Sequence, residues 1–144
     1  MVQKLPHDEF LKTFEKVPRV AISLFIENSS NEVLLAKRAI SPGENTWHLP
    51  GSFILKGESI KECIKRILGT ELGYNGEFAY KVANVFEDLN KDPRGHVIDM
   101  VYKIEASSDI PALPTSETKE AAYFKTLPDH IGFNHLEVLH RLGR

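Results

Sequence analysis

The segment Gly51 to Tyr74 places a carboxylate where an amphipathic helix should carry an apolar residue. At about 100° per residue, one side of this segment forms an apolar stripe. The stripe consists of Ile60, Cys63, Ile64, Ile67 and Leu68. Glu71 lies eleven residues after Ile60 and falls on the same stripe. A carboxylate on the buried face of a helix needs a partner, because burial without one costs free energy.

Local chemistry predicts both ends of this helix. Ser59 and Glu62 form a capping box, and Gly73 supplies the left-handed residue that ends a helix. The helix therefore spans about Ile60 to Leu72. In its last turn the helix dipole repels the Glu71 carboxylate by up to about 1 kcal/mol. Mg²⁺ would offset this cost and suits a site with one or two carboxylates and substrate phosphates. An arginine partner, or a side chain turned to solvent, is an equal alternative.

Taken with this helix, the segment resembles the Nudix box. In that family the box runs Gly, five residues, Glu, seven residues, Arg-Glu, an aliphatic residue, any residue, Glu-Glu, any residue, Gly and an aliphatic residue. Here Ser52 stands at the first glycine position, Glu58, Arg66, Glu71 and Gly73 match, and Ile67 and Thr70 replace two glutamates. The resemblance implies an α/β/α sandwich around a mixed β-sheet, the Nudix fold. It also implies that Glu71 and the Ser52 backbone carbonyl bind Mg²⁺ and that Arg66 organises the catalytic box.

The two replacements are similar to those of one branch, the GDP-mannose mannosyl hydrolases, which also keep the Arg and the last Glu. The upstream sequence is similar as well, over Val17–Val20, Phe25–Asn28, Leu34–Arg38 and Trp47–Gly51. The resemblance implies that Arg38 meets a substrate phosphate, a task that suits a guanidinium. His48 is a second candidate for the ligand pocket. A solvated strand-end Arg and a His that faces the core or solvent are the alternatives.

The segment Ser116 to Glu120 lies where that branch carries a late catalytic loop. Glu117 is a candidate metal ligand or general base, and Glu120 is a second candidate base. An ordinary solvated loop is an equal alternative for both. The catalytic histidine of the branch falls near Thr118, and its first-strand acid falls near Ser23. This chain therefore has no equivalent of that histidine or of that acid at these positions.

The segment Asp92 to Ile98 resembles one that precedes a core strand in many Nudix ADP-ribose pyrophosphatases. Its aspartate, proline and glycine suit a type I turn and need no other explanation. Arg94 and His96 are not needed for the turn. They are candidates for contact with the substrate's diphosphate or terminal sugar, and a surface Arg and a strand-start His are the alternative.

Length and composition fit one domain over residues 1–144. The net charge is −2 and the basic residues are dispersed, so no nucleic-acid partner is expected. The single cysteine, Cys63, lies on the apolar stripe, and the absence of a disulfide framework suits a reducing cytoplasm. We expect no membrane span, because no apolar run is long enough. A homodimer is left open.

Periodicity and turn residues predict the remaining elements. We expect an N-terminal helix near Phe10 to Phe14, a hairpin, an extended segment broken at Pro50, three further strands and a closing helix. The predicted ranges are Val20–Asn28 and Glu32–Arg38 for the hairpin, Trp47–Ile54, Val82–Leu89, Val97–Ala106 and Ala121–Lys125 for the other strands, and Asn134–Leu142 for the closing helix.

These observations predict a Mg²⁺-dependent hydrolase of a nucleoside diphosphate sugar, of the GDP-mannose mannosyl hydrolase type. An ADP-ribose-type pyrophosphatase is the first alternative. The two differ in the bond that breaks, because water attacks the sugar carbon in the first and phosphorus in the second. A Nudix domain that binds a nucleotide without turning it over is the second alternative, since two box glutamates are replaced.

Overall fold

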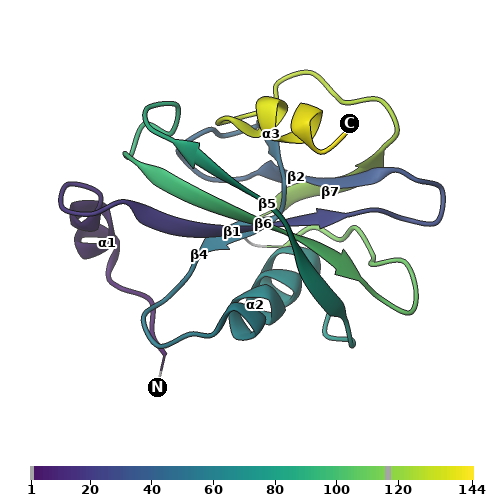
Figure 1. The fold of residues 1–144 in the computed structure, drawn as a ribbon, viewed down its shortest axis with the longest axis horizontal. Helices are drawn as coiled ribbons and strands as arrows, with labels where there is room; N and C mark the ends of the chain where they lie inside the picture. Colours follow the sequence, from purple (N-terminus) through teal and green to yellow (C-terminus); the bar gives the residue numbers. More distant parts are fainter. Residues whose placement is uncertain (1, 116–117) are drawn as a thin grey trace.

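The computed structural model describes residues 2–115 and 118–144, in which two β-sheets lie between helices (Figure 1). Sheet A has the strand order β4-β1-β6-β5, and sheet B has the order β3-β2-β7. The elements are α1 His7–Thr13, β1 Arg19–Ile26, β2 Val33–Arg38, β3 Trp47–His48, β4 Gly51–Phe53, α2 Ile60–Leu72, β5 Ala79–Asp88, β6 Val97–Glu105, β7 Thr118–Phe124 and α3 His135–Arg141. Of the predicted site residues, Glu117 lies outside the described residues.

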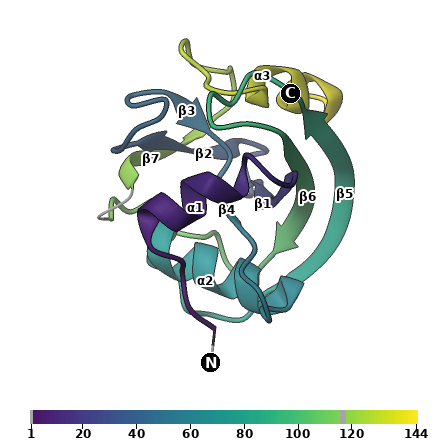
Figure 2. The ribbon, with the colours of Figure 1, turned by 90° about the vertical axis from the view of Figure 1, so that its left-hand side faces the viewer.

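Sheet A is a mixed sheet built around β1. Strand β1 runs antiparallel to β4 and parallel to β6, and β6 runs antiparallel to β5. Helices α2 and α3 lie on opposite sides of the strands, and α1 lies beside β4 (Figure 2). The predicted α/β/α sandwich around a mixed sheet is therefore confirmed.

Side-chain alternation along β1 divides the interior into two apolar cores. Even-numbered residues such as Ile22 and Leu24 pack against α2. Odd-numbered residues such as Phe25 face the opposite side, where α3 contributes Val138 and Leu139. Successive side chains of a strand point to opposite faces. One strand thus carries both the α2 face and the α3 face of sheet A.

Helix α2 has the predicted bounds and caps. The Ser59 hydroxyl accepts a hydrogen bond from the Glu62 amide at 3.1 Å, and Gly73 has φ 68°. Glu71 is on the buried side of the helix with the apolar stripe. The sequence was sufficient here because capping and periodicity are local properties of the chain.

The structure corrects the predicted hairpin. Strands β1 and β2 belong to different sheets and share one isolated bridge, between Glu27 and Val33. The turn itself forms as expected, because the Asn28 side-chain oxygen accepts from the amides of Ser30 and Glu32. Strands β4 and β6 occupy both hydrogen-bonding edges of β1, so no edge is left for β2.

The predicted break at Pro50 marks the crossing from sheet B to sheet A. Strand β3 pairs with β2. After the two residues Leu49 and Pro50, β4 pairs with β1. At Gly51 a Cβ atom would lie 2.7 Å from the carbonyl oxygen of Ile22, so the close approach of β4 to β1 requires glycine. Strand β5 begins at Ala79, three residues before the predicted start, because exposed residues continue its pairing with β6.

Candidate active site on strand β4

Strand β4 is three residues long, and each residue contacts one of the predicted site side chains. The Gly51 amide donates to Glu71 Oε2 at 3.2 Å. The Ser52 hydroxyl accepts from Arg66 Nη1 at 3.0 Å. The Phe53 ring lies 5.1 Å from the Arg94 guanidinium carbon. Because β4 is an edge strand of sheet A, it brings the helix box and the Arg94 loop to one edge.

Glu71 is 7% exposed, and the Gly51 amide provides it with a hydrogen-bond donor. The described residues contain no group of three or more His, Cys, Asp or Glu side chains arranged to hold a metal ion. One carboxylate at the edge strand nevertheless fits Mg²⁺, because this ion keeps several waters and takes the remaining ligands from substrate phosphates. Glu71 is the side chain that would hold it, and the Ser52 carbonyl stays a predicted second ligand.

Arg66 fastens the loop between β4 and α2. Its guanidinium donates to both Glu58 carboxylate oxygens, at 2.8 and 2.9 Å, and to the Phe53 carbonyl oxygen at 3.0 Å. These hydrogen bonds hold the pKa of Glu58 below its usual value. The partner is Glu58, because the loop folds back onto the helix flank. Arg66 has the position of an organiser of the box.

The two replaced glutamate positions offer no carboxylate or amide to a metal ion. Ile67 is fully buried in the core against α2. Thr70 is exposed, and its hydroxyl donates to the Arg66 carbonyl oxygen at 2.9 Å. Glu71 thus remains the carboxylate that α2 presents on its buried side.

Glu120 lies on β7 opposite Lys37 of β2 and is exposed. Its neighbour Ala121 packs toward the core against α2. Because side chains alternate along a strand, Glu120 points to the other side of sheet B. The structure therefore does not bring Glu120 to the α2 side on which Glu71 lies.

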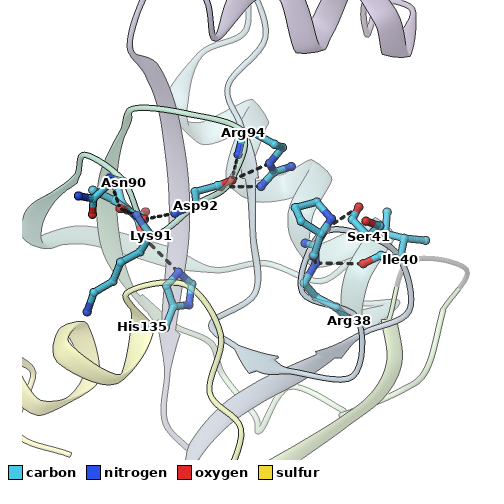
Figure 3. Close-up of polar contacts among 11 residues, drawn as sticks. Arg38, Ile40, Ser41, Asn90, Lys91, Asp92, Arg94 and His135 are labelled. Atoms are coloured by element: carbon cyan, nitrogen blue, oxygen red, sulfur yellow. Dashed lines mark hydrogen bonds and ion pairs between the residues drawn. The ribbon is translucent and has the colours of Figure 1, made fainter.

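Arg38, the last residue of β2, and Arg94, in the loop before β6, meet at one aromatic ring, that of Phe133. Their guanidinium carbons lie 5.3 and 5.8 Å from the centre of this ring. The Arg38 side chain donates to the carbonyl oxygens of Pro42 at 2.5 Å and Ile40 at 3.3 Å (Figure 3). Two guanidinium groups near one ring form a basic and aromatic surface suited to phosphate and planar groups.

The loop before β6 holds Arg94 in place. The Asp88 carboxylate accepts from the amides of Asn90, Lys91 and Asp92 at 3.2, 2.7 and 3.1 Å. The Asp92 carboxylate then receives two hydrogen bonds from the Arg94 guanidinium, at 3.0 and 2.8 Å (Figure 3). The predicted turn is present, since the Gly95 amide donates to the Asp92 carbonyl oxygen. A guanidinium anchored by an ion pair keeps a defined direction.

The two histidine candidates, His48 and His96, have buried ring nitrogens. His48 is 7% exposed, and its Nδ1 lies 2.6 Å from the Leu49 carbonyl oxygen. Burial, with smaller contributions from His135 and Arg38, lowers the pKa of His48 to about 3. His96 has a buried Nε2 that finds no hydrogen-bond partner among the residues described.

Several side chains at this edge were not anticipated from the sequence. Phe53 and Phe133 supply the rings that meet Arg94, and Asp99 and His135 form a buried pair behind them. Phe133 has φ 54°, which is unusual for a bulky residue. Asp99 had a signal in the sequence, because it interrupts the apolar run from Val97 to Tyr102. The aromatic residues had none, since most phenylalanines simply fill cores.

The chain belongs to the family of the NUDIX domain, whose sequence model matches residues 17–131. It is 31% identical over 125 residues to an ADP-ribose pyrophosphatase of Methanocaldococcus jannaschii, and the match covers 85% of this chain and 71% of that protein. Nudix hydrolase is thus the class that the box, the fold and the relatives share. Among the described helices, none combines the length and apolar character needed to cross a membrane.

Solved structures agree on the fold. A bifunctional NMN adenylyltransferase/ADP ribose pyrophosphatase from Francisella tularensis, complexed with AMP and a Mn ion, is similar with a TM-score of 0.74 and 19% identity. The match covers 94% of this chain and 46% of that one, so this chain spans less than half of the bifunctional protein. The NUDIX domain of Shewanella oneidensis NrtR, complexed with ADP ribose, is similar with a TM-score of 0.72 and 19% identity over 95% of this chain and 96% of that one.

Proposed function

We propose that this Nudix hydrolase acts on a nucleoside diphosphate derivative at the β4 edge, and that ADP-ribose is the substrate to test first. The observation that carries the proposal is the position of β4 between Glu71 and Arg94. A diphosphate laid across this edge would have a carboxylate for a metal ion on one side and an anchored guanidinium on the other. The relative that is an ADP-ribose pyrophosphatase supports the choice of substrate.

Each group at the edge has a defined task in this proposal. Arg38 and Arg94 bind phosphate oxygens, and the Phe133 ring packs against the base or a sugar. Arg66 keeps the loop and β4 in place through Glu58 and Ser52. The left-handed backbone of Phe133 supports its assignment, because such conformations concentrate at ligand sites.

The proposed cofactor is Mg²⁺, held by Glu71 and the Ser52 carbonyl, with Mn²⁺ as the ion to compare. A structurally similar protein contains a Mn ion. When bound, the ion would neutralise charge on the diphosphate as the leaving group departs. The proteins are similar at 19% identity, so the ion of that structure suggests a comparison rather than an assignment.

We assign the general base to Glu117, with Glu120 as its matched control. Glu120 is exposed and points away from the α2 side of sheet B. Glu117→Gln should therefore lower turnover by about 10²-fold or more, the usual contribution of a positioned base, whereas Glu120→Gln should leave it unchanged. Steady-state rates with ADP-ribose and Mg²⁺ measure both. Equal activity of wild type and Glu117→Gln would remove Glu117 from the reaction.

A GDP-mannose mannosyl hydrolase activity is the second candidate. It is favoured by the box, since Ile67 is buried, Thr70 is exposed, and neither offers a carboxylate for a second metal ion. One ion is sufficient to stabilise a departing diphosphate, whereas attack at phosphorus is often assisted by two. The ADP-ribose pyrophosphatase relative therefore favours attack at phosphorus, whereas the box favours attack at the sugar carbon.

Hydrolysis in ¹⁸O-labelled water separates the two reactions. ADP-ribose and GDP-mannose would each be incubated with the enzyme and Mg²⁺, and the products would be identified by mass. Label in a phosphate of either product indicates attack at phosphorus. Label in a free sugar that is first released as the inverted anomer indicates attack at carbon. No turnover of any nucleotide sugar, together with measurable binding, would indicate a nucleotide-binding Nudix domain.

Two further expectations belong to this proposal. A reducing cytoplasm fits the free, buried thiol of Cys63, whose pKa is raised to about 12 by burial. A homodimer stays a prediction, which the molar mass from light scattering would test.

A further inference from the structure

Leu49, between β3 of sheet B and β4 of sheet A, is held by two histidines to which the function proposed above gives no task. The Leu49 amide donates to His135 Nδ1 at 3.0 Å, across the space between β3 and α3. The Leu49 carbonyl oxygen lies 2.6 Å from His48 Nδ1. The two rings are 6.1 Å apart, and both residues are less than a tenth exposed. Both polar groups of Leu49 thus meet an imidazole in a buried setting.

These contacts determine which ring nitrogen carries the proton in His135 and in His48. His135 Nδ1 accepts a hydrogen bond, so it carries no proton and the proton of the neutral ring is on Nε2. The reverse holds for His48, whose Nδ1 donates to a carbonyl oxygen and therefore carries the proton. Two neighbouring histidines are thus held in opposite tautomers by one residue of the backbone.

Asp99 explains why His135 keeps its tautomer. The Asp99 carboxylate lies on β6 with its Oδ2 3.5 Å from His135 Nε2, and both side chains are buried. A carboxylate at this nitrogen favours a proton on Nε2, which leaves Nδ1 to accept. His135 projects from the start of α3 toward the strands (Figure 3). The other oxygen, Oδ1, has no hydrogen-bond partner among the described residues.

Leu49 lies two residues before Gly51, whose amide contacts Glu71. The Leu24 amide donates to the Pro50 carbonyl oxygen at 2.8 Å, and the Gly51 amide donates to Glu71 Oε2 at 3.2 Å. Three successive residues, Leu49 to Gly51, are therefore each fixed by a hydrogen bond. A displacement at Leu49 would move the donor that orients the Glu71 carboxylate.

We propose that Asp99 and His135 are positioning residues, which act through Leu49 to set the geometry of Glu71 and the start of β4. The effect on metal binding rests on the function proposed above, whereas the clamp of Leu49 by His135 does not. Neither residue touches the substrate or the metal ion in this account. Groups that orient metal ligands in this way commonly change metal affinity or activity by about 10- to 100-fold when they are replaced.

Two substitutions at His135 separate its contact with Leu49 from its contact with Asp99. The side-chain oxygen of Asn can occupy the place of Nδ1, so His135→Asn keeps an acceptor for the Leu49 amide. The amide of Gln reaches the place of Nε2, so His135→Gln keeps the contact with Asp99 and loses the acceptor. We expect Mn²⁺ affinity, measured by titration calorimetry, to fall about tenfold or more in His135→Gln and to stay within about threefold in His135→Asn. Glu71→Gln is the control for loss of the metal site.

Nuclear magnetic resonance of the wild-type protein tests the clamp without any metal or substrate. The ¹⁵N shifts of His135 should show an unprotonated Nδ1 and a protonated Nε2, and the Leu49 amide should exchange slowly with solvent. A proton on Nδ1, or a Leu49 amide that exchanges as fast as exposed loop amides, would overturn the clamp. In Asp99→Asn the ring should populate both tautomers, because an amide can accept from Nε2 or donate to it.

The outcomes for the clamp and for the proposed function are distinct. Equal Mn²⁺ affinity in wild type, His135→Asn and His135→Gln would refute the positioning of Glu71, provided that Glu71→Gln lowers it. If Glu71→Gln binds Mn²⁺ as wild type does, the metal site itself is wrong, and the shifts of His135 still decide the clamp. If His135→Gln does not fold, the wild-type shifts decide the clamp, and an Mn²⁺ affinity of Asp99→Asn unchanged from wild type would refute the positioning of Glu71.

Discussion

The two faces of sheet A differ in what they bury. The face toward α2 is apolar, and its charged groups, Glu58 with Arg66 and Glu71, lie at its border beside β4. The face toward α3 also has an apolar core, but it adds buried polar side chains. These are Ser23, His48, Asp99 and His135.

This difference separates stability from orientation. Burial of apolar side chains on the α2 face lowers the free energy of the folded state. Such a core tolerates apolar substitutions that keep its volume. Buried polar groups on the α3 face cost free energy unless each finds its partner, and so they favour one arrangement of the chain. We therefore expect the α2 face to contribute stability alone, and the α3 face also to fix the direction of the groups on β4. Four experiments test this division.

The largest effect is expected at the border of the α2 face. Glu71→Gln keeps the shape of the side chain and removes its charge, so Mg²⁺-dependent turnover should fall by about 10²-fold or more, the scale of several kcal/mol in metal-ion catalysis. The melting temperature should stay within a few degrees of wild type. Glu62→Gln, on the exposed side of the same helix, is the control and should retain activity. Full activity of Glu71→Gln would sink the metal assignment.

A substitution inside the α2 core should instead lower the stability of the protein and leave its activity largely intact. Ile67→Ala removes a fully buried side chain, and the free energy of unfolding should fall by about 2–5 kcal/mol. Activity per folded molecule should fall far less than in Glu71→Gln, because Ile67 has no polar atom to offer to a metal ion or substrate. Urea unfolding and active-site titration measure the two quantities. Leu136→Ala, at a side chain 46% exposed, should cost less than half as much.

A smaller effect is expected where the guanidinium groups meet the aromatic rings. Arg94→Lys keeps the charge but loses the two-pronged contact with Asp92 and the flat surface over Phe53. KM for the nucleotide substrate should rise about tenfold, with kcat within about threefold. Arg141→Lys, at an exposed ion pair with Glu137, provides the control. A fall in kcat with unchanged KM would place Arg94 in the chemical step instead.

The mildest test uses pH to probe the α3 face. The pKa of His48 is lowered from 6.5 to about 3 in the folded protein, chiefly by burial. Between these values the unfolded chain binds a proton that the folded protein does not. The free energy of unfolding should therefore fall as the pH falls, by up to about 1.4 kcal/mol per pH unit. His48→Asn, whose side-chain amide can still donate to the Leu49 carbonyl, should show a smaller slope. An unchanged slope would mean that other groups cause the acid sensitivity.

The α2 face could be read from the sequence because its signals are local. The stripe around Ile64, the Ser59 cap and the Gly73 end all lie within one helix, and the structure has them where they were expected. The partner of Arg66 had no such local signal. The loop returns Glu58 to the helix, and spacing along a helix says nothing about a loop.

The α3 face was hidden because its contacts join distant segments. His135 and Leu49 are 86 residues apart, and no periodicity links them. Asp99 had a readable signal, a lone carboxylate in an apolar strand, which is the kind of signal that singled out Glu71 in its helix. The substrate preference was also beyond the sequence, since the box resembles one branch while a relative 31% identical to this chain is an ADP-ribose pyrophosphatase.

The place of β1 in sheet A has a consequence for the order in which the molecule folds. On one edge β1 pairs with β4, which follows soon in the chain, and on the other it pairs with β6, so that Arg19 meets Val97. Distant pairs form more slowly, because a longer loop must close first. The part of the α2 face formed by α2, β1 and β4 can therefore assemble while β6 and α3 are still unfolded, and the polar clamp forms last. In a pulsed hydrogen-exchange experiment during refolding, the amide of Ile64 should become protected before that of Leu49, and the reverse order would contradict this sequence of events.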